Sequence, residues 1–140
     1  MMAAREKILV VEDDPDIMRL LTHTLTDAGY RVIPAYGGED ALRKVKLQRP
    51  DLILTDLAMP KMSGVEIIQK IKDDPETHHI PILAVTAYVW DSLAQSAGQV
   101  GCDGFVGKPF NAKHLLREVA RHLAVPGHRP VSQPTGSKAG

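Results

Sequence analysis

The segment PDLILTD, residues 50–56, decides the fold of this 140-residue chain. Its apolar run at 52–54 is short and uninterrupted, which is typical of a strand that a parallel sheet buries on both faces. The run leads directly through Thr55 to Asp56, so an acid stands at the C-terminal end of the predicted strand. Ligands of open parallel sheets bind outside such ends. The segment therefore predicts a buried strand and a functional carboxylate, Asp56.

Comparable apolar runs occur at 8–11 and 82–85, and two further short strands are predicted at 31–35 and 104–107. Amphipathic stretches separate them, and the first has the marks of a helix that Asp14 caps and Gly29 ends. Ser63 and Asn111 are in equivalent positions before two later helices. The stretch predicted as a helix over 91–100 is poor in large apolar residues, so we expect it to be the least firmly packed.

Strict alternation of strand and helix predicts the α/β class, with a five-stranded parallel sheet and helices on both faces. Right-handed crossovers leave few topologies. The flavodoxin-like (βα)5 order 2-1-3-4-5 places the second strand at an edge, where Pro34 costs no ladder hydrogen bond. We expect one domain over 1–125. Residues 126–140 are rich in proline, glycine, serine and basic residues, which indicates a flexible tail.

Composition excludes several classes of function. Lysine plus arginine and aspartate plus glutamate both number 17, and this balance argues against direct nucleic acid binding. The one cysteine, Cys102, has no neighbouring base and is expected to be a small buried thiol. The N-terminal apolar run is four residues long and ends in acids, so we expect no signal peptide, no membrane insertion and a cytoplasmic location.

Polar side chains follow four of the predicted strands. Glu12 and Asp13 come after the first, Asp56 after the third, Thr86 after the fourth and Lys108 after the fifth. Carboxylates that meet at one edge repel one another, and a hard divalent cation such as Mg²⁺ relieves that repulsion. A lysine and a hydroxyl beside one aspartate complete a pattern that favours phosphoryl transfer.

The chain resembles the response-regulator receiver domains of two-component signalling over residues 7 to 124. The resemblance is carried by four segments in order: KILVVEDDPDI (7–17), PDLILTDLAMPKMSGVE (50–66), IPILAVTA (80–87) and GFVGKPF (104–110). Any one segment is a weak signal, but four in order and near the family's spacing are specific.

The resemblance implies a role for each matching residue. Asp56 matches the residue that accepts the phosphoryl group and also helps to bind Mg²⁺. Asp13 matches the principal metal ligand, Glu12 its neighbour that acts through water, and the backbone carbonyl of Ala58 the third protein ligand. The other matches are the catalytic and switch threonine Thr86, the catalytic lysine Lys108 before a cis-type Pro109, and the aromatic switch position Phe105.

The function implied is that of a phosphorylation-activated switch and not of an enzyme that turns over a substrate. A sensor histidine kinase or a histidine phosphotransfer protein would donate the phosphoryl group to Asp56. The surface formed by the regions 91–100, 104–107 and the last helix would then change and dock to a downstream protein target. The chain resembles stand-alone regulators of chemotaxis and cell polarity, expected to be monomers or weak phosphorylation-linked dimers.

Four positions depart from the commonest family pattern. Glu12 replaces an aspartate, and Phe105 replaces a tyrosine. Ala58 and Tyr88 stand two residues after Asp56 and Thr86, where side chains tune the lifetime of the phosphoryl group. Alanine has no group to orient an attacking water, so slow self-dephosphorylation is expected.

Other interpretations of the same residues stay open. A flavin-binding protein would share the fold but would need a phosphate loop free of acids after the first strand. A Mg²⁺-dependent phosphohydrolase would need a second acid where Ala58 stands. A receiver could also signal by binding alone. Individually, Asp56 could be a turn residue, Thr86 a strand end, Lys108 a solvated lysine and Trp90 a lone surface aromatic or a partner contact.

Overall fold

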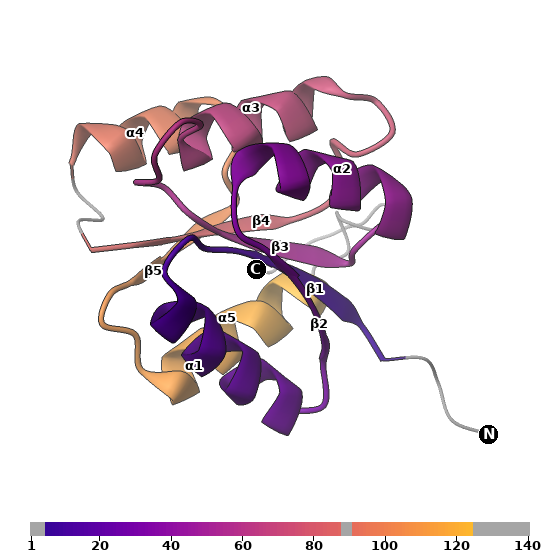
Figure 1. Cartoon of the computed structure of the whole chain (residues 1–140), viewed down its shortest axis with the longest axis vertical. Helices are drawn as coiled ribbons and strands as arrows, with labels where there is room; N and C mark the ends of the chain where they lie inside the picture. Colours follow the sequence, from indigo (N-terminus) through magenta and orange to yellow (C-terminus); the bar gives the residue numbers. More distant parts are fainter. Residues whose placement is uncertain (1–4, 88–90, 125–140) are drawn as a thin grey trace.

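The computed structural model describes residues 5–87 and 91–124, and within them five strands and five helices alternate (Figure 1). The strands are β1 (Lys7–Val11), β2 (Arg31–Ala35), β3 (Leu52–Asp56), β4 (Ile82–Thr86) and β5 (Gly104–Gly107). The helices are α1 (Pro15–Asp27), α2 (Gly38–Gln48), α3 (Gly64–Asp73), α4 (Ser92–Gln99) and α5 (Ala112–Ala124).

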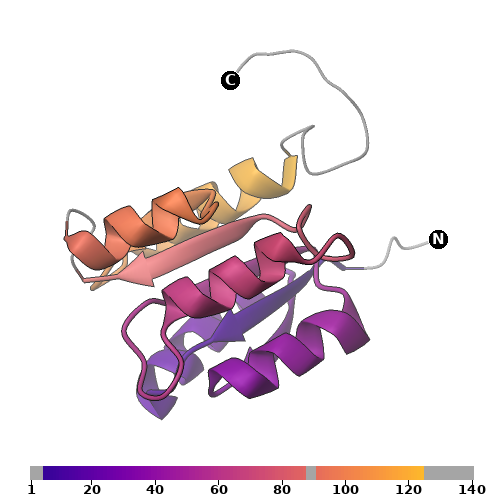
Figure 2. The ribbon, with the colours of Figure 1, turned by 90° about the horizontal axis from the view of Figure 1, so that it is seen from above.

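The sheet has the predicted flavodoxin-like topology. All its strand pairs are parallel and their order is β2-β1-β3-β4-β5. The helices α2, α3 and α4 lie in a row over one face (Figure 2), while α1 and α5 lie together on the other (Figure 1). The predicted fold class, with helices on both faces, is confirmed.

Two apolar clusters, one on each face of the sheet, form the core. Strand residues divide between them by alternation: Leu9 and Ile53 pack toward α2 and α3, and Ile8 and Leu52 pack toward α1 and α5. Every residue of β3 and β4 is buried. Burial on both faces is why these strands are uninterrupted apolar runs in the sequence.

The helix starts match the caps expected from sequence. The Asp14 carboxylate accepts the backbone N–H groups of Asp16 and Ile17 at 2.9 and 3.3 Å. Ser63 and Asn111 accept in the same way at the starts of α3 and α5. These side chains satisfy donors that the first turn of a helix leaves without partners.

Some element boundaries differ from the prediction. The fourth strand includes Thr86, and α4 is shorter than 91–100 because Asp91 caps it from outside the helix. The end of α2 was less predictable: Arg49 adopts a left-handed conformation with φ of 50°, where glycine is the usual residue. The two buried residues of α4 are alanines, in keeping with its small contribution to the core.

The outer edge of β2 is poorly suited to strand pairing. The Arg31 N–H donates to the carbonyl oxygen of Glu6, and the Ala35 carbonyl oxygen accepts from the Glu12 N–H. The backbone groups of odd-numbered residues of β2 therefore face the neighbouring strand, β1. By alternation Val32 and Pro34 face outward. Pro34 has no N–H to offer, and its carbonyl oxygen accepts a hydrogen bond from Lys44 Nζ of α2. Val32 alone presents an N–H on this edge of the described strand.

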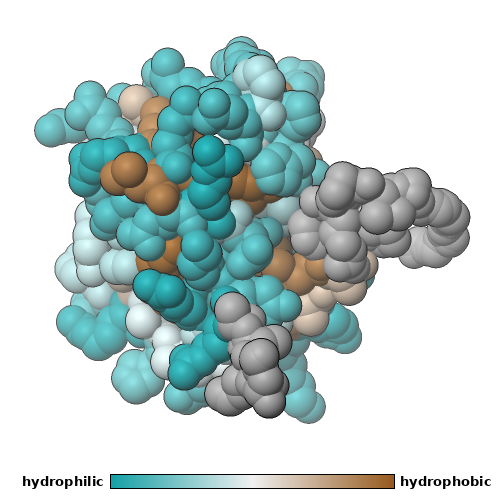
Figure 3. Space-filling model, turned by 90° about the vertical axis from the view of Figure 1, so that its right-hand side faces the viewer, coloured by the Kyte–Doolittle hydropathy of each residue, from teal (hydrophilic) through white to brown (hydrophobic). Residues whose placement is uncertain are grey.

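On the face that Figure 3 shows, hydrophobic side chains form small groups among hydrophilic ones. Among the large apolar residues that the structure describes, Leu47 of α2 is the most exposed. None of the described helices is long and apolar enough to cross a bilayer. The predicted tail at 126–140, Tyr88 and Trp90 lie outside the described residues, so the domain boundary at 125 stays a prediction.

Candidate functional site

The parallel register brings the predicted polar residues to one edge of the sheet. Asp56 is the last residue of β3 and lies opposite Val85, one residue before Thr86 at the end of β4. Thr86 in turn pairs with Gly107, so Lys108 follows at the end of β5. Glu12 and Asp13 follow β1, whose last residue pairs with the residue before Asp56. Strand geometry alone therefore gathers residues that are up to 96 positions apart in the sequence.

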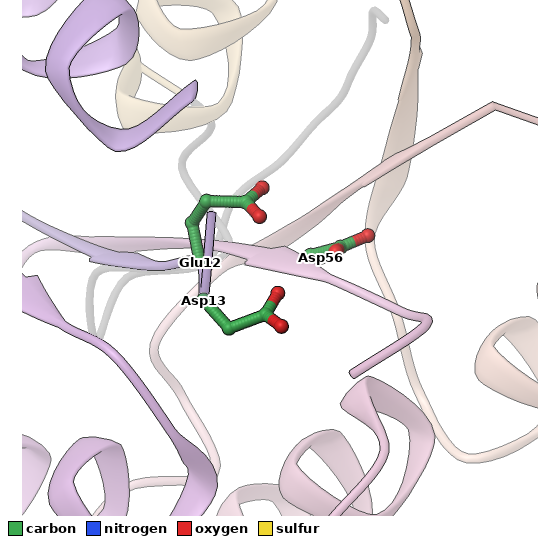
Figure 4. A group of neighbouring side chains, drawn as sticks. All are labelled: Glu12, Asp13 and Asp56. Atoms are coloured by element: carbon green, nitrogen blue, oxygen red, sulfur yellow. The ribbon is translucent and has the colours of Figure 1, made fainter. Parts of the chain in front are cut away.

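Three carboxylates, those of Glu12, Asp13 and Asp56, converge there. One oxygen of each lies within 4.8 Å of the others, and Figure 4 shows the side chains directed toward a common space. Glu12 and Asp56 are buried, whereas Asp13 is exposed. The cluster therefore has two acids in the wall of the site and one at its mouth.

Burial and charge both act against ionisation of Glu12. Desolvation, followed by the negative charge of Asp56, raises the pKa of Glu12, although the Asp14 N–H and Lys108 oppose the shift. Glu12 Oε2 accepts the Asp14 N–H at 3.1 Å. Oε1 is buried and lies in ion-pair contact with Lys108, but it accepts no hydrogen bond of acceptable geometry from the described residues.

Lys108 supplies the positive charge that the cluster needs. Its Nζ lies 3.3 Å from Glu12 Oε1 and 3.4 Å from Asp56 Oδ1, in ion-pair contact with both. The Lys108 N–H donates to the carbonyl oxygen of Thr86 at 2.8 Å, and a cis bond joins Lys108 to Pro109, as expected. The backbone thus fixes the lysine at the end of β5 and directs its ammonium group toward Asp56.

Hydrogen bonds and the close packing of Gly64 constrain the backbone around Asp56. Ala58 is exposed, and its N–H lies 3.4 Å from Asp56 Oδ1, a long hydrogen bond. Gly64, the first residue of α3, donates its N–H to the carbonyl oxygen of Leu57 at 2.9 Å. A Cβ atom on Gly64 would lie 2.2 Å from the carbonyl oxygen of Asp56. Ser63 marks this helix start in the sequence, but the close packing of Gly64 was not predicted.

The remaining predicted residues surround the cluster at different distances from it. Thr86 is buried at the end of β4. Phe105 is half-buried on β5, and it packs on the core cluster beneath α3 and α4. The roles of Thr86 and Phe105 as switch residues stay predictions. Cys102 was expected to be buried but is half-buried; its thiol donates to Gly104 O at 3.1 Å, and desolvation raises the pKa of the thiol.

The donor set fits a hard divalent cation. All the converging atoms are carboxylate oxygens, which Mg²⁺ prefers, and the exposed Asp13 leaves one side open to water. The pKa of Glu12 is raised first by desolvation and then by the negative charge of Asp56, and the ion pair with Lys108 opposes this shift without cancelling it. A single lysine cannot neutralise three carboxylates, so a cation would relieve the remaining repulsion.

Comparisons with known proteins agree with this geometry. The model of the family described as "Response regulator receiver domain" matches residues 8–120. Among curated proteins, the polar-differentiation response regulator DivK of Brucella anthropi is 33% identical over 118 residues, which cover 84% of this chain and 96% of that protein.

Solved structures match equally well. The chemotaxis protein CheY4 of Vibrio cholerae is 36% identical with a TM-score of 0.81, covering 85% of this chain and 99% of that one. The receiver domain of the sensor histidine kinase PA1611 from Pseudomonas aeruginosa is 30% identical with a TM-score of 0.82, covering 87% and 100%. That structure has a magnesium ion coordinated in its active site cleft.

Proposed function

The chain belongs to the response regulator receiver domain family of two-component signalling, and from this premise we propose that Asp56 is the residue that accepts the phosphoryl group. The contact of Lys108 Nζ with Asp56 Oδ1, beside three converging carboxylates, carries the assignment. Within the cluster, Asp56 is the residue that ends a strand in the middle of the sheet, since β3 lies between β1 and β4. Its side chain is buried in the wall of the site, close to the exposed Asp13 at the mouth.

The step is a displacement at phosphorus. A carboxylate oxygen of Asp56 forms a bond to phosphorus while the bond from phosphorus to the imidazole nitrogen of a phosphohistidine breaks, and a proton completes the leaving imidazole. The Lys108 ammonium lies where charge on the transferred group would be stabilised. The Thr86 hydroxyl and the Ala58 N–H are expected to donate to the same group.

We propose Mg²⁺ as the cofactor, held by Glu12, Asp13, Asp56 and the backbone carbonyl of Ala58. When bound, Mg²⁺ would neutralise the carboxylates and the charge on the phosphoryl oxygens. Asp13 and Asp56 are expected to contact the ion directly, and Glu12 to act through water. The residues of this chain then provide position and charge, which is most of what phosphoryl transfer requires.

The partners are proposed from the same chemistry. The donor is a sensor histidine kinase or a histidine phosphotransfer protein, and the acceptor of the signal is a downstream protein that docks on the surface of α4, β5 and α5. We define this as the docking surface. The protein acts in the cytoplasm, as a monomer or a weak phosphorylation-linked dimer. Because Ala58 replaces the second acid that a phosphohydrolase would use, no turnover of phosphate esters is expected.

A direct chemical test is phosphorylation by a small donor. The full chain is treated with acetyl phosphate or phosphoramidate and Mg²⁺, and its intact mass is measured. We expect a gain of one phosphoryl group that is lost in Asp56→Ala, reduced in Lys108→Ala and absent when Mg²⁺ is chelated. Asp27→Asn, an exposed acid at the far end of α1, is the matched control and should behave as wild type. Gain of the same mass by Asp56→Ala would place the acceptor elsewhere.

A further inference from the structure

The outward face of α5 carries an unusual arrangement of charge. Its buried residues, Leu115, Val119 and His122, face the sheet. Its exposed residues are Ala112, Lys113, Arg117, Ala120, Arg121 and Ala124. Residues four apart lie on the same side of a helix, so the three cations form one stripe about 12 Å long, at 1.5 Å per residue. Small alanine side chains flank this stripe.

This stripe is mostly free of neutralising acids. On α1 and α2 the basic residues are paired with acids: Arg19 lies 3.0 Å from Asp16, one turn away, and Lys46 lies 2.9 Å from Asp74. Arg121 is also paired, with Glu118 at 2.8 Å, yet its side chain stays 58% exposed. In the ranges 5–87 and 91–124, no acid lies within ion-pair distance of Lys113 or Arg117. Their charge is therefore available to a partner.

The rest of the docking surface adds little charge. The sequence of α4, SLAQSAGQ, and that of β5, GFVG, contain no ionisable residue. Residues 112–140 hold five of the 17 lysines and arginines but one of the 17 acids, Glu118. Residues 1–111 therefore hold 12 cations against 16 acids. A neutral chain is divided into an acidic body and a basic C-terminal region.

We propose that the stripe of Lys113, Arg117 and Arg121 selects a downstream protein that presents an acidic helix, with carboxylates repeating every four residues along one face. The proposal rests on the proposed function, because α5 is part of the docking surface, and it adds the chemistry of the partner. Charge complementarity of this kind sets specificity and the rate of association. The alanines beside the stripe let a second helix approach closely.

Other anionic partners fit less well. A membrane-surface helix needs an apolar face to insert among lipids, and the apolar face of α5 is packed against the sheet. A nucleic acid would meet three cations on one short stripe, enough for weak contacts with phosphates only. It would also be repelled by an acidic body. An acidic protein helix matches both the length and the spacing.

The test uses the full chain and two synthetic, alanine-based helical peptides of about 18 residues, a length at which such helices form. Both carry the same number of glutamates. In one the glutamates repeat every four residues on a single face, and in the other they are spread around the helix. Fluorescence anisotropy should give at least tenfold tighter binding for the first peptide. This preference should weaken as salt is raised.

Reversing the charge of two α5 cations tests whether the one-faced peptide binds at this helix. Lys113→Glu/Arg117→Glu should weaken binding of the one-faced peptide at least tenfold, while Arg31→Glu/Lys70→Glu, exposed cations on β2 and α3, should bind as wild type. Equal binding of the two peptides, or an equal loss in both double variants, would overturn the proposal. So would tighter binding of duplex DNA or anionic vesicles than of the one-faced peptide.

These results separate the two proposals. The α5 double variant should still gain one phosphoryl group, because Lys113 and Arg117 lie outside the carboxylate cluster. Asp56→Ala should lose that gain yet keep its preference for the one-faced peptide in the unphosphorylated state. If wild type is phosphorylated but does not prefer the one-faced peptide, the proposal of an acidic partner fails and the proposed function stands. Loss of phosphorylation in wild type refutes the proposed function alone.

Discussion

Gly64 lies so close to Asp56 that a Cβ atom at position 64 would stand 2.2 Å from the Asp56 carbonyl oxygen. The start of α3 thus rests directly on the backbone of the proposed phosphoryl acceptor. The obstacle is backbone and cannot move aside as the end of a flexible side chain could. Helix position and site geometry are therefore linked through a contact that requires glycine.

Gly64→Ala should destabilise the fold by about 2 kcal/mol or more, because overpacking against fixed backbone forces a shift of α3. The midpoint of urea unfolding measures the effect. Gly98→Ala is the matched control: it lies in α4 with open space around its Cβ position, so alanine should be neutral or stabilise by up to about 1 kcal/mol. Equal stability of the two variants would show that α3 can shift at little cost in the free energy of unfolding.

Magnesium should stabilise the folded protein through the carboxylate cluster. A ligand at ten times its Kd adds about 1.4 kcal/mol to the free energy of unfolding when it binds the folded state alone. Thermal unfolding with and without Mg²⁺ should show this gain in wild type and its loss in Asp13→Asn. The exposed Asp27→Asn should keep the gain. A magnesium effect that survives Asp13→Asn would remove Asp13 from the ligand set.

The raised pKa of Glu12 predicts that, without a bound metal, the folded protein loses stability as pH rises. Since the folded protein holds this proton more tightly than the unfolded chain, its contribution to stability is present below the ordinary value of 4.5 and is lost as pH rises through the folded pKa. In chelator, Glu12→Gln should therefore gain stability relative to wild type as pH rises from 4 toward 7. Urea unfolding at a series of pH values measures the difference, and a difference that shrinks over this range contradicts the prediction.

Ala58 predicts a long phosphoryl lifetime. The residue is exposed and its N–H lies beside Asp56 Oδ1, yet its side chain has no polar group to orient water. Ala58→Asn should shorten the half-life of the phosphorylated form several-fold, because positioning a nucleophile is a large part of such catalysis. Decay of the phosphorylated mass after removal of the donor gives the half-life, and Ala112→Asn on α5 is the control. A half-life of a few seconds in wild type, unchanged in Ala58→Asn, contradicts this.

Much of the fold was predictable because local and global signals agree. Uninterrupted apolar runs gave β3 and β4, and Asp14, Ser63 and Asn111 marked the helix starts with side chains that capping requires. Alternation with right-handed crossovers then restricted the order of the strands. The left-handed Arg49 was not predictable, since neither glycine nor asparagine marks the end of α2.

The composition of the site was predictable, but its contacts were not. Residues at strand ends had to converge once the sheet was parallel, which gave Asp56, Glu12 and Lys108. That Lys108 Nζ contacts both acids, and that the buried Glu12 Oε1 has this ion pair but no hydrogen bond among the described residues, depends on side-chain conformations that spacing does not encode. Ser63 likewise marked the start of α3, but the close packing of Gly64 on Asp56 appears only in three dimensions.

The edge of β2 limits how this protein can associate with other protein chains. Adding a strand from another chain requires a regular row of free N–H and C=O groups. Pro34 interrupts that row, and Lys44 occupies the carbonyl oxygen at the same residue. Strand-by-strand growth into polymers is thus blocked at this edge even when the protein is concentrated. Association through this part of the molecule is left to helices and loops, whose side chains can distinguish one partner from another.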